Sequence, residues 1–360
     1  MVDIKILSKG IRAMKQEFFT LRWTGAELQL IDQTLLPETI AYIELNSYEA
    51  VSDAILHMKV RGAPAIGIAA AYGMVLAAKA APATDLSSFR AALSQAASHL
   101  VRSRPTAVNL RWAVERMLSQ AEVSDALAIP DIIHALEQEA VLIHDEDRQI
   151  NRAIGENLLT LLKDDDTVLT HCNAGALATS EYGTALSVFY LAQEKGIRLK
   201  AYADETRPRL QGARLTAFEL LHNGVDVTLI CDNMAAVVMA QGKIDAVIVG
   251  CDRVAANGDT ANKIGTFNVS ILAKHFGIPF YIAAPTPTID LCCTSGADIP
   301  IEERSSREIT MIDQHRIAPE GIKTYNPAFD VTPAAHITAI VTEKGIVYPP
   351  YTDHLSKLFE

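Results

Sequence analysis

Two patterns of hydrophobic and polar positions divide the chain. From Tyr48 to about Asp145, apolar residues recur at helical spacing in several successive segments. After about residue 150, short β-branched runs alternate with helical stretches, a pattern that indicates βαβ units and a parallel sheet. The predicted strands are residues 167–170, 197–203, 225–230, 244–250 and 279–284.

The segment before the helices predicts a small antiparallel ribbon, because residues 22–46 hold two strand-like runs around a turn at Leu36–Pro37. The charged stretch 144–152 is the candidate boundary, within or beside a connecting helix. We therefore predict an α/β protein with an N-terminal β-ribbon and helical domain, residues 1–147, and a C-terminal parallel-sheet domain, residues 148–360. The length of 360 residues agrees with two domains, since single cores stop growing at roughly 250 to 300 residues.

Composition and charge exclude several classes of protein. The formal net charge of −11 disfavours a nucleic-acid partner and requires any phosphate site to be built locally from Arg, Lys and backbone N–H groups. Five cysteines without CxxC spacing argue against a disulfide framework and a structural zinc site, and HExxH and GxxxxGK[ST] motifs are missing. The chain has no run of about 20 uninterrupted apolar residues, and its first residues carry charges where a signal peptide is apolar. We expect a cytoplasmic protein that binds no membrane.

Polar side chains gather where the predicted strands end. Ligands of an open α/β sheet bind beyond the carboxyl ends of its strands, although every βα loop also needs polar turn residues. The residues that we expect at this edge are Cys172, Asp204, Glu205, Arg207, Arg209, Gln211 and Asp252.

Cys172 and Asp252 have the most specific positions. Cys172 follows a strand and precedes a predicted helix, whose N–H groups and dipole would lower the thiol pKa from about 8.5 and suit it to proton transfer or nucleophilic attack. Packing is the alternative, and it is the preferred interpretation for Cys231, Cys251 and Cys292–Cys293. Asp252 closes the most apolar strand, where desolvation would raise its pKa toward the range of an acid catalyst. Capping of the next turn is the alternative.

Two further positions predict an anion site. Lys263 lies near the start of a predicted helix, where a cation opposes the helix dipole unless a phosphate also binds there. In the stretch 61–67, Gly62 permits an unusual backbone, Pro64 fits the first helical position, and Arg61 is available for an anion. Close helix packing is the alternative explanation for the small residues of this stretch.

Four motifs together resemble the methylthioribose-1-phosphate isomerase family: RGAPAIGIAAAYG, HCNAGALAT, ETRPRLQGARLTAFEL and GCDRVAANGDTANKIGT. The resemblance covers nearly the whole chain, and residues 1–13 look like a short N-terminal extension. The wider family also contains ribose-1,5-bisphosphate isomerases and non-catalytic regulatory subunits of a translation-factor exchange complex. Because Cys172 and Asp252 are both present, the motifs favour the isomerase branch. The resemblance implies a Rossmann-like C-terminal domain and a homodimer.

The resemblance also implies a reaction, the conversion of 5-methylthioribose 1-phosphate to 5-methylthioribulose 1-phosphate in methionine salvage, without cofactor or metal. The alternatives are another sugar phosphate, ribose 1,5-bisphosphate or 5-deoxyribose 1-phosphate, or a non-catalytic regulatory protein. Asp252 would be the acid at the ring oxygen. Cys172 would be the thiolate base that moves hydrogen from C2 to C1, or a thiol that shapes a direct hydride shift. The residues implied to bind substrate are Arg61, Gly62, Ala63, Arg104, Gln211, Asn262 and Lys263.

Overall fold

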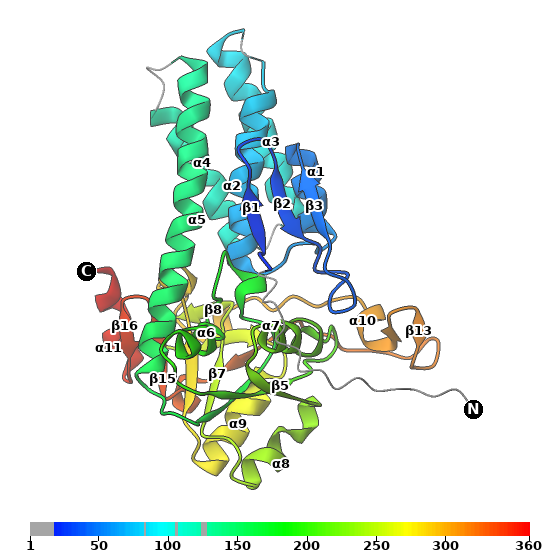
Figure 1. Cartoon of the computed structure of the whole chain (residues 1–360), viewed down its shortest axis with the longest axis vertical. Helices are drawn as coiled ribbons and strands as arrows, with labels where there is room; N and C mark the ends of the chain where they lie inside the picture. The colour runs from blue at the N-terminus through cyan, green and yellow to red at the C-terminus, as the bar shows by residue number, and fades with distance from the viewer. Residues whose placement is uncertain (1–17, 83, 105–106, 124–127) are drawn as a thin grey trace, which may run out of the picture.

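The structure, a computed structural model, describes residues 18–82, 84–104, 107–123 and 128–360. Residues 1–13, expected to be an extension, lie outside this range. An upper helical part stands on a lower part built around a sheet (Figure 1). Over the described residues, the upper part begins with a three-stranded antiparallel sheet of β1 (Leu21–Trp23), β2 (Leu28–Ile31) and β3 (Tyr42–Leu45). The predicted ribbon is confirmed, with an additional strand because the chain already turns back at Thr24–Glu27.

The predicted helical region is confirmed, and its helices stand upright beside the ribbon (Figure 1). Helix α2 is buried over almost its whole length, which accounts for its continuous apolar composition. By length and composition α2 could cross a membrane, but 78% of it is buried inside the protein. The helices are α1 (Tyr48–Leu56), α2 (Ala63–Ala80), α3 (Leu86–Ser103), α4 (Val108–Val123) and α5 (Ile129–Leu159).

Helix α5 connects the two parts. Its first half contributes Leu136 and Ile143 to the upper hydrophobic core, and its second half contributes Ile154 and Leu158 to a core of the lower part. The charged stretch 144–152 lies within this helix, between the residues of the two cores. The domain division at this stretch stays a prediction.

In the described part of the chain, the lower sheet has seven strands in the order β16-β15-β10-β7-β4-β5-β6. All are parallel except β16, which pairs antiparallel with β15 at one edge. The predicted strands are confirmed as β4, β5, β6, β7 and β10, whereas β15 and β16 were not predicted. The bounds are β4 (Thr167–Thr170), β5 (Lys200–Asp204), β6 (Asp226–Ile230), β7 (Ala246–Val249), β10 (Phe280–Ala283), β15 (Ala339–Thr342) and β16 (Gly345–Val347).

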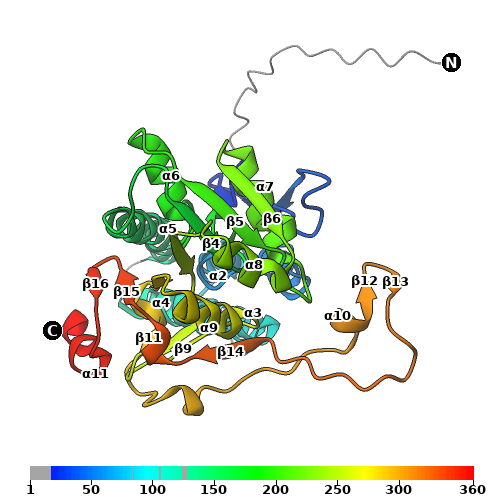
Figure 2. The ribbon, with the colours of Figure 1, turned by 90° about the horizontal axis from the view of Figure 1, so that it is seen from below.

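Helices cover both faces of this sheet (Figure 2). Because side chains of a strand alternate, Val168 faces the core shared with α5, α6 (Ser187–Glu194) and α7 (Ala217–His222). Its neighbour Leu169 faces the core shared with α8 (Ala235–Ala240), α9 (Thr266–Phe276) and α11 (Tyr351–His354). The α/β class with a Rossmann-like parallel sheet is therefore confirmed.

The strand order reverses between β4 and β7, since the chain passes from β4 through β5 and β6 and then crosses to β7. In open α/β sheets, the carboxyl ends of strands at such a reversal form the ligand-binding crevice. Directly after β7 the chain forms a second sheet that was not predicted, with β8 (Arg253–Ala255), β9 (Thr260–Lys263), β11 (Ile289–Asp290) and β14 (Phe329–Thr332). The short elements α10 (Arg307–Thr310), β12 (Met311–Ile312) and β13 (His315–Arg316) project to one side (Figure 2).

Gly155 allows α5 to pack closely on α6, because a Cβ at this position would lie 2.7 Å from Ser187 Oγ and from a methyl carbon of Leu191. Gly155→Ala should therefore lower the free energy of unfolding by about 1 to 3 kcal/mol, although alanine is the better helix former. Urea denaturation measures this change. Gln149→Ala on the exposed face of the same helix is the control and should change stability by less than about 0.5 kcal/mol. An unchanged or increased stability of Gly155→Ala would contradict this packing.

Candidate active site

Cys172 lies at the reversal of strand order, two residues beyond β4. Its φ of +66° is in the left-handed region, which is unfavourable for residues other than glycine. Two hydrogen bonds hold this conformation: the Cys172 N–H donates to Thr206 Oγ1 at 2.8 Å, and the Cys172 carbonyl accepts from the Thr216 hydroxyl at 2.6 Å. The side chain of Cys172 is buried.

The helix predicted directly after Cys172 is wrong. The chain forms a loop with a short 3₁₀ turn at Ala176–Ala178, and α6 begins only at Ser187. Without an adjacent α-helix N-terminus, burial dominates and raises the pKa of the Cys172 thiol, while Arg61 and Lys263 oppose this rise only in part. The predicted lowering of the Cys172 pKa is therefore also wrong, and the resting group is a thiol.

Asp252 follows β7 at the same reversal of strand order. Its N–H donates to the carbonyl of Ala261 at 2.9 Å, a contact that starts the β8–β9 hairpin. The side chain reaches solvent, yet the protein packed around it desolvates the carboxyl and raises its pKa, against the opposing charges of Lys263, Arg61 and Arg104. The expected direction of the Asp252 pKa is confirmed.

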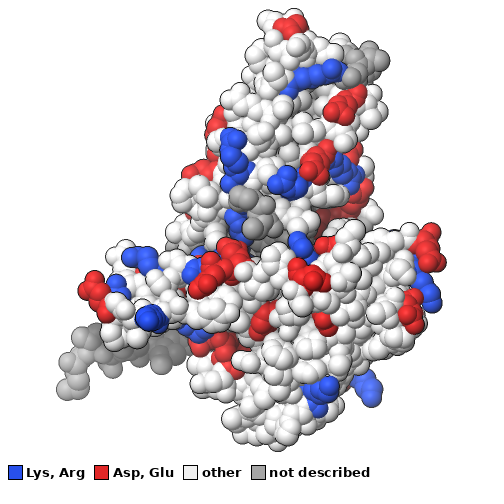
Figure 3. Space-filling model, turned by 180° about the vertical axis from the view of Figure 1, so that it is seen from behind, with Lys and Arg blue, Asp and Glu red and all other residues white. Residues whose placement is uncertain are grey.

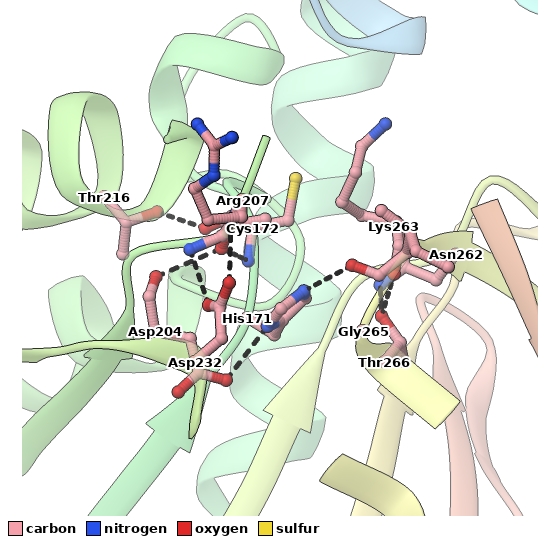
Figure 4. Close-up of polar contacts among 12 residues, drawn as sticks. His171, Cys172, Asp204, Arg207, Thr216, Asp232, Asn262, Lys263, Gly265 and Thr266 are labelled. Atoms are coloured by element: carbon pink, nitrogen blue, oxygen red, sulfur yellow. Dashed lines mark hydrogen bonds and ion pairs between the residues drawn. The ribbon is translucent and has the colours of Figure 1, made fainter. Parts of the chain in front are cut away.

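Lys263 is the last residue of β9 and does not lie in a helix; α9 begins at Thr266, after Gly265. The predicted helical position of Lys263 is wrong because the β8–β9 hairpin continues through it. This hairpin instead brings Asn262 and Lys263 beside Asp252. Lys263 Nζ donates to the Ala328 carbonyl at 3.0 Å, and burial lowers its pKa. The Lys263 ammonium and the Cys172 sulfur point to the same side of the site (Figure 4).

The start of α2 reaches the loop that follows Cys172. Gly62 has a φ of +91°, and a Cβ there would lie 2.3 Å from the Ala178 carbonyl oxygen, so only glycine fits. Ala63 begins the helix, so Pro64 is its second residue, one position later than predicted but still in the first turn. Arg61 donates to Asn173 Oδ1 at 2.8 Å and to the Asn173 carbonyl at 3.2 Å.

Arg104 and Gln211 complete the predicted set. Arg104 is the half-buried residue at the end of α3, where burial and the nearby charge of Arg304 lower its pKa while Glu302 and Asp252 oppose the change. Gln211 is buried in the loop after β5, and its Oε1 has no hydrogen-bond partner among the described residues. This amide oxygen is a buried acceptor without a partner in the described part of the chain, and a role for Gln211 in substrate binding stays a prediction.

The structure thus brings the sequence-predicted cations to the two predicted catalytic groups. Arg61 and Lys263 each affect the titration of Cys172 and Asp252. On the face drawn in Figure 3, by contrast, the described Lys and Arg side chains are interspersed with Asp and Glu. A chain of net charge −11 therefore gathers cations locally, as an anion site requires. The roles of the individual residues stay predictions.

The residues that hold Arg61 in place were not predicted from the sequence. Glu219, fully buried on α7, accepts hydrogen bonds from the Asn173 amide, from the Ala176 N–H at 2.7 Å and from the Tyr190 hydroxyl at 2.6 Å. These contacts fix the Asn173 amide so that its oxygen faces Arg61. Burial raises the pKa of Glu219 to about 7. The sequence carries no signal for this role, because Glu219 reads as an ordinary polar position of a short helix.

His171, Asp204 and Asp232 are a group of described residues that could hold a metal ion, since their ligand atoms lie within 4.8 Å of one another. Apart from Asp204 Oδ1, which is buried without a partner among the described residues, these atoms are nevertheless engaged in hydrogen bonds. Both nitrogens of His171 face acceptors, and the two oxygens of Asp232 accept the N–H groups of Thr206 and Arg207, each at 2.7 Å. The arrangement is a hydrogen-bonded cluster, and the expectation of a reaction without metal or cofactor stays a prediction.

Arg207 and Arg209 follow β5 at the expected edge, where the charge of Arg209 acts on Arg61 and Arg104, and both also contact the segment that carries α10. Arg207 donates to the Ile309 carbonyl at 3.0 Å, and Arg209 pairs with Glu308 at 2.8 Å. Their side chains are used to fix this segment.

Residues 59–349 match the Initiation factor 2 subunit family, and the chain belongs to this family. Its relatives include sugar 1-phosphate isomerases, in agreement with the resemblance of the motifs. A Clostridium botulinum (strain Kyoto / Type A2) protein named 5-deoxyribose 1-phosphate isomerase is 60% identical over 346 residues, which are 96% of this chain and 99% of the relative.

Two solved structures share the fold over almost their full length. The 5-methylthioribose 1-phosphate isomerase of Pyrococcus horikoshii OT3 is 44% identical, with a TM-score of 0.91 over 98% of this chain and 99% of that chain. The structure described as translation initiation factor eIF-2B, subunit delta, from A. fulgidus is 44% identical, with a TM-score of 0.88 over 95% and 99%.

Replacing Arg61, Arg104 or Lys263 by alanine should weaken the binding of inorganic phosphate by about 1.5 to 3 kcal/mol, because each substitution removes one charged donor. Isothermal titration calorimetry measures the affinity. Arg198→Ala is the control, since Arg198 is exposed at the opposite edge of the sheet and pairs with Asp164. Wild-type affinity in the three site variants would show that these cations are misassigned.

Proposed function

We propose that this protein is an aldose-ketose isomerase that converts 5-deoxyribose 1-phosphate to 5-deoxyribulose 1-phosphate. The observation that carries the proposal is the meeting of Cys172 and Asp252 at the reversal of strand order, with Arg61, Arg104 and Lys263 around them. The resemblance of the motifs favours 5-methylthioribose 1-phosphate, but the relative at 60% identity supports the alternative substrate, 5-deoxyribose 1-phosphate. A cytoplasmic homodimer without metal, cofactor or nucleic acid is part of the proposal.

The proposed reaction begins at the ring oxygen. A phosphate on the anomeric oxygen prevents the spontaneous ring opening of free aldoses, so the C1–O bond of the ring must be broken with help from an acid. Asp252, whose raised pKa favours the protonated form, donates its proton to the ring oxygen. The electron pair of the bond leaves with that oxygen, and C1 becomes electron-deficient. The Asp252 carboxylate then accepts the proton of the C2 hydroxyl as the ketone forms.

Hydrogen must also move from C2 to C1, and Cys172 offers two routes. In the first, the Cys172 thiol gives its proton to solvent, the resulting thiolate removes the C2 proton, an enol forms between C1 and C2, and the sulfur then returns a proton to C1. In the second, hydride passes directly from C2 to C1 while a neutral thiol shapes the site. Burial of Cys172 favours the neutral thiol, whereas Arg61 and Lys263 favour the thiolate. An isotope experiment separates the routes.

5-Methylthioribose 1-phosphate is the second candidate substrate, supported by the Pyrococcus horikoshii isomerase at 44% identity. The two sugars share the phosphate and the reacting carbons and differ only in the substituent at C5. A non-catalytic regulatory role is the third possibility, because one similar structure is described as a translation initiation factor subunit. The presence of both Cys172 and Asp252 argues against it.

The function is tested by incubating the protein with 5-deoxyribose 1-phosphate, 5-methylthioribose 1-phosphate and ribose 1,5-bisphosphate and identifying ketose products by NMR. We expect the highest kcat/KM for 5-deoxyribose 1-phosphate. Cys172→Ser and Asp252→Asn should each reduce kcat by about 10²- to 10⁴-fold while substrate binding is retained, because each removes one proton-transferring group. Wild-type turnover in Cys172→Ser would show that Cys172 only packs in the core. No turnover of any of the three sugars would contradict the proposal.

Turnover in deuterated water distinguishes the two hydrogen-transfer routes. A thiolate base exchanges some of its proton with solvent, so deuterium should enter C1 of the ketose, whereas a hydride shift keeps the original hydrogen. From the cations beside Cys172, we expect measurable deuterium at C1 in the NMR spectrum. A product without deuterium, together with an inactive Cys172→Ser variant, would contradict the base route and favour the hydride shift.

A further inference from the structure

His171 is buried directly before Cys172, and both of its ring nitrogens face hydrogen-bond acceptors. Nδ1 lies 2.9 Å from Asp204 Oδ2, and Nε2 lies 2.9 Å from the carbonyl oxygen of Ile264 (Figure 4). A carbonyl oxygen and a carboxylate can only accept, whereas a neutral imidazole carries one N–H. Both hydrogen bonds therefore require one additional proton on the His171–Asp204 pair.

The groups around the His171–Asp204 pair favour the form that carries this additional proton. Burial disfavours the imidazolium, but the hydrogen bonds with Asp204 and Ile264 and the negative charge of Asp232 outweigh burial and raise the pKa of His171. Burial also raises the pKa of Asp204, and the charges of Asp232 and Glu205 add to this rise. Asp330 of β14 is a further negative group near His171. The side chains of Cys172 and Lys263 point to the opposite side from the imidazole (Figure 4).

The imidazole joins the two strand ends that form the candidate site. It belongs to the residue before Cys172, and its Nε2 contacts the residue after Lys263. The following Gly265 has a φ of +103°, and a Cβ there would lie 2.8 Å from Nε2 of His171. Its N–H donates to Asp330 at 2.7 Å. The turn after β9 therefore packs against the imidazole of His171. The separation between Cys172 and Lys263 depends on this contact.

We propose that His171 is a positioning residue that holds Cys172 and the phosphate ligand Lys263 on one side of the site through a proton shared with Asp204. The inference rests on the proposed function for the roles of Cys172 and Lys263. Because the pKa of His171 is raised, both hydrogen bonds of its ring are present at low pH. One of them is lost as the pH rises through the pKa of His171. Phosphate binding through Lys263 then weakens.

Asp204→Asn tests the shared proton. The amide at position 204 can donate to Nδ1 while a neutral imidazole donates from Nε2 to Ile264, so both hydrogen bonds persist without a titrating proton. The Kd of inorganic phosphate is measured for both proteins from slightly acidic to alkaline pH, and the ratio of wild type to Asp204→Asn cancels the titration of phosphate itself. We expect this ratio to rise by about tenfold with pH, the effect of one hydrogen bond. A constant ratio contradicts the proposal.

His171→Gln supplies a rescue test. Its amide can donate to Ile264, but its carbonyl oxygen then faces the acceptor Asp204, so we expect weaker phosphate binding. Adding Asp204→Asn provides a donor for this carbonyl and should restore the affinity, whereas a residue needed only for its bulk would show no such rescue. Failure of the rescue in a folded double variant contradicts the proposal.

Nitrogen-15 NMR of labelled histidine gives a readout that needs neither phosphate nor turnover. The His171 ring resonances should move as the pH rises through the pKa of His171 in the wild-type protein and stay constant in Asp204→Asn. A wild-type ring that does not titrate overturns the inference. Because this measurement does not depend on the sugar, failure of the proposed function and failure of the shared proton are distinguished.

Discussion

The site depends on the burial of the polar groups of residues 171–173 at the centre of the sheet. A buried polar group without a partner is costly, so each of these groups has to find one. The partners come from different segments: Asp204 and Ile264 for the His171 ring, Thr206 and Thr216 for the Cys172 backbone, and Glu219 and Arg61 for the Asn173 side chain. The hydrogen bonds that residues 171–173 require therefore align the ends of β4, β5 and β9, helix α7 and the start of α2.

The same constraint explains how an acidic chain keeps an anion site. Burial lowers the pKa values of Arg61, Arg104 and Lys263, which means that holding these cations in the protein opposes folding. Asp252 and Glu219 offset part of this cost at Arg61. Because the compensation is partial, an incoming phosphate improves the electrostatics of the site, and attraction arises locally in spite of the net charge of −11.

The parallel sheet could be predicted because its buried strands are short, continuous apolar runs such as Val247–Val249, bounded by turn residues. The β8–β9 hairpin could not, since Arg253–Ala255 and Thr260–Lys263 lack both alternation and β-branched enrichment. The segment after Lys263 has helical periodicity, but the left-handed Gly265 ends the strand and delays the helix. The sequence placed Cys172 and Asp252 at the correct edge, yet the environment of the thiol follows from a loop that folds back around Glu219, a residue distant in sequence.

The raised pKa values of Cys172 and Asp252 bear on the order of steps in the proposed reaction. Burial raises the pKa of both groups, so the resting site favours the acid forms that the first step needs. Once Asp252 has protonated the ring oxygen and the C1–O bond has broken, the electron deficiency at C1 acidifies the hydrogen on C2. Removing that hydrogen then requires a weaker base than the closed ring would demand. Cys172 acts as this base only as a thiolate, a form that Arg61 and Lys263 favour and burial opposes, so its proton transfer follows ring opening.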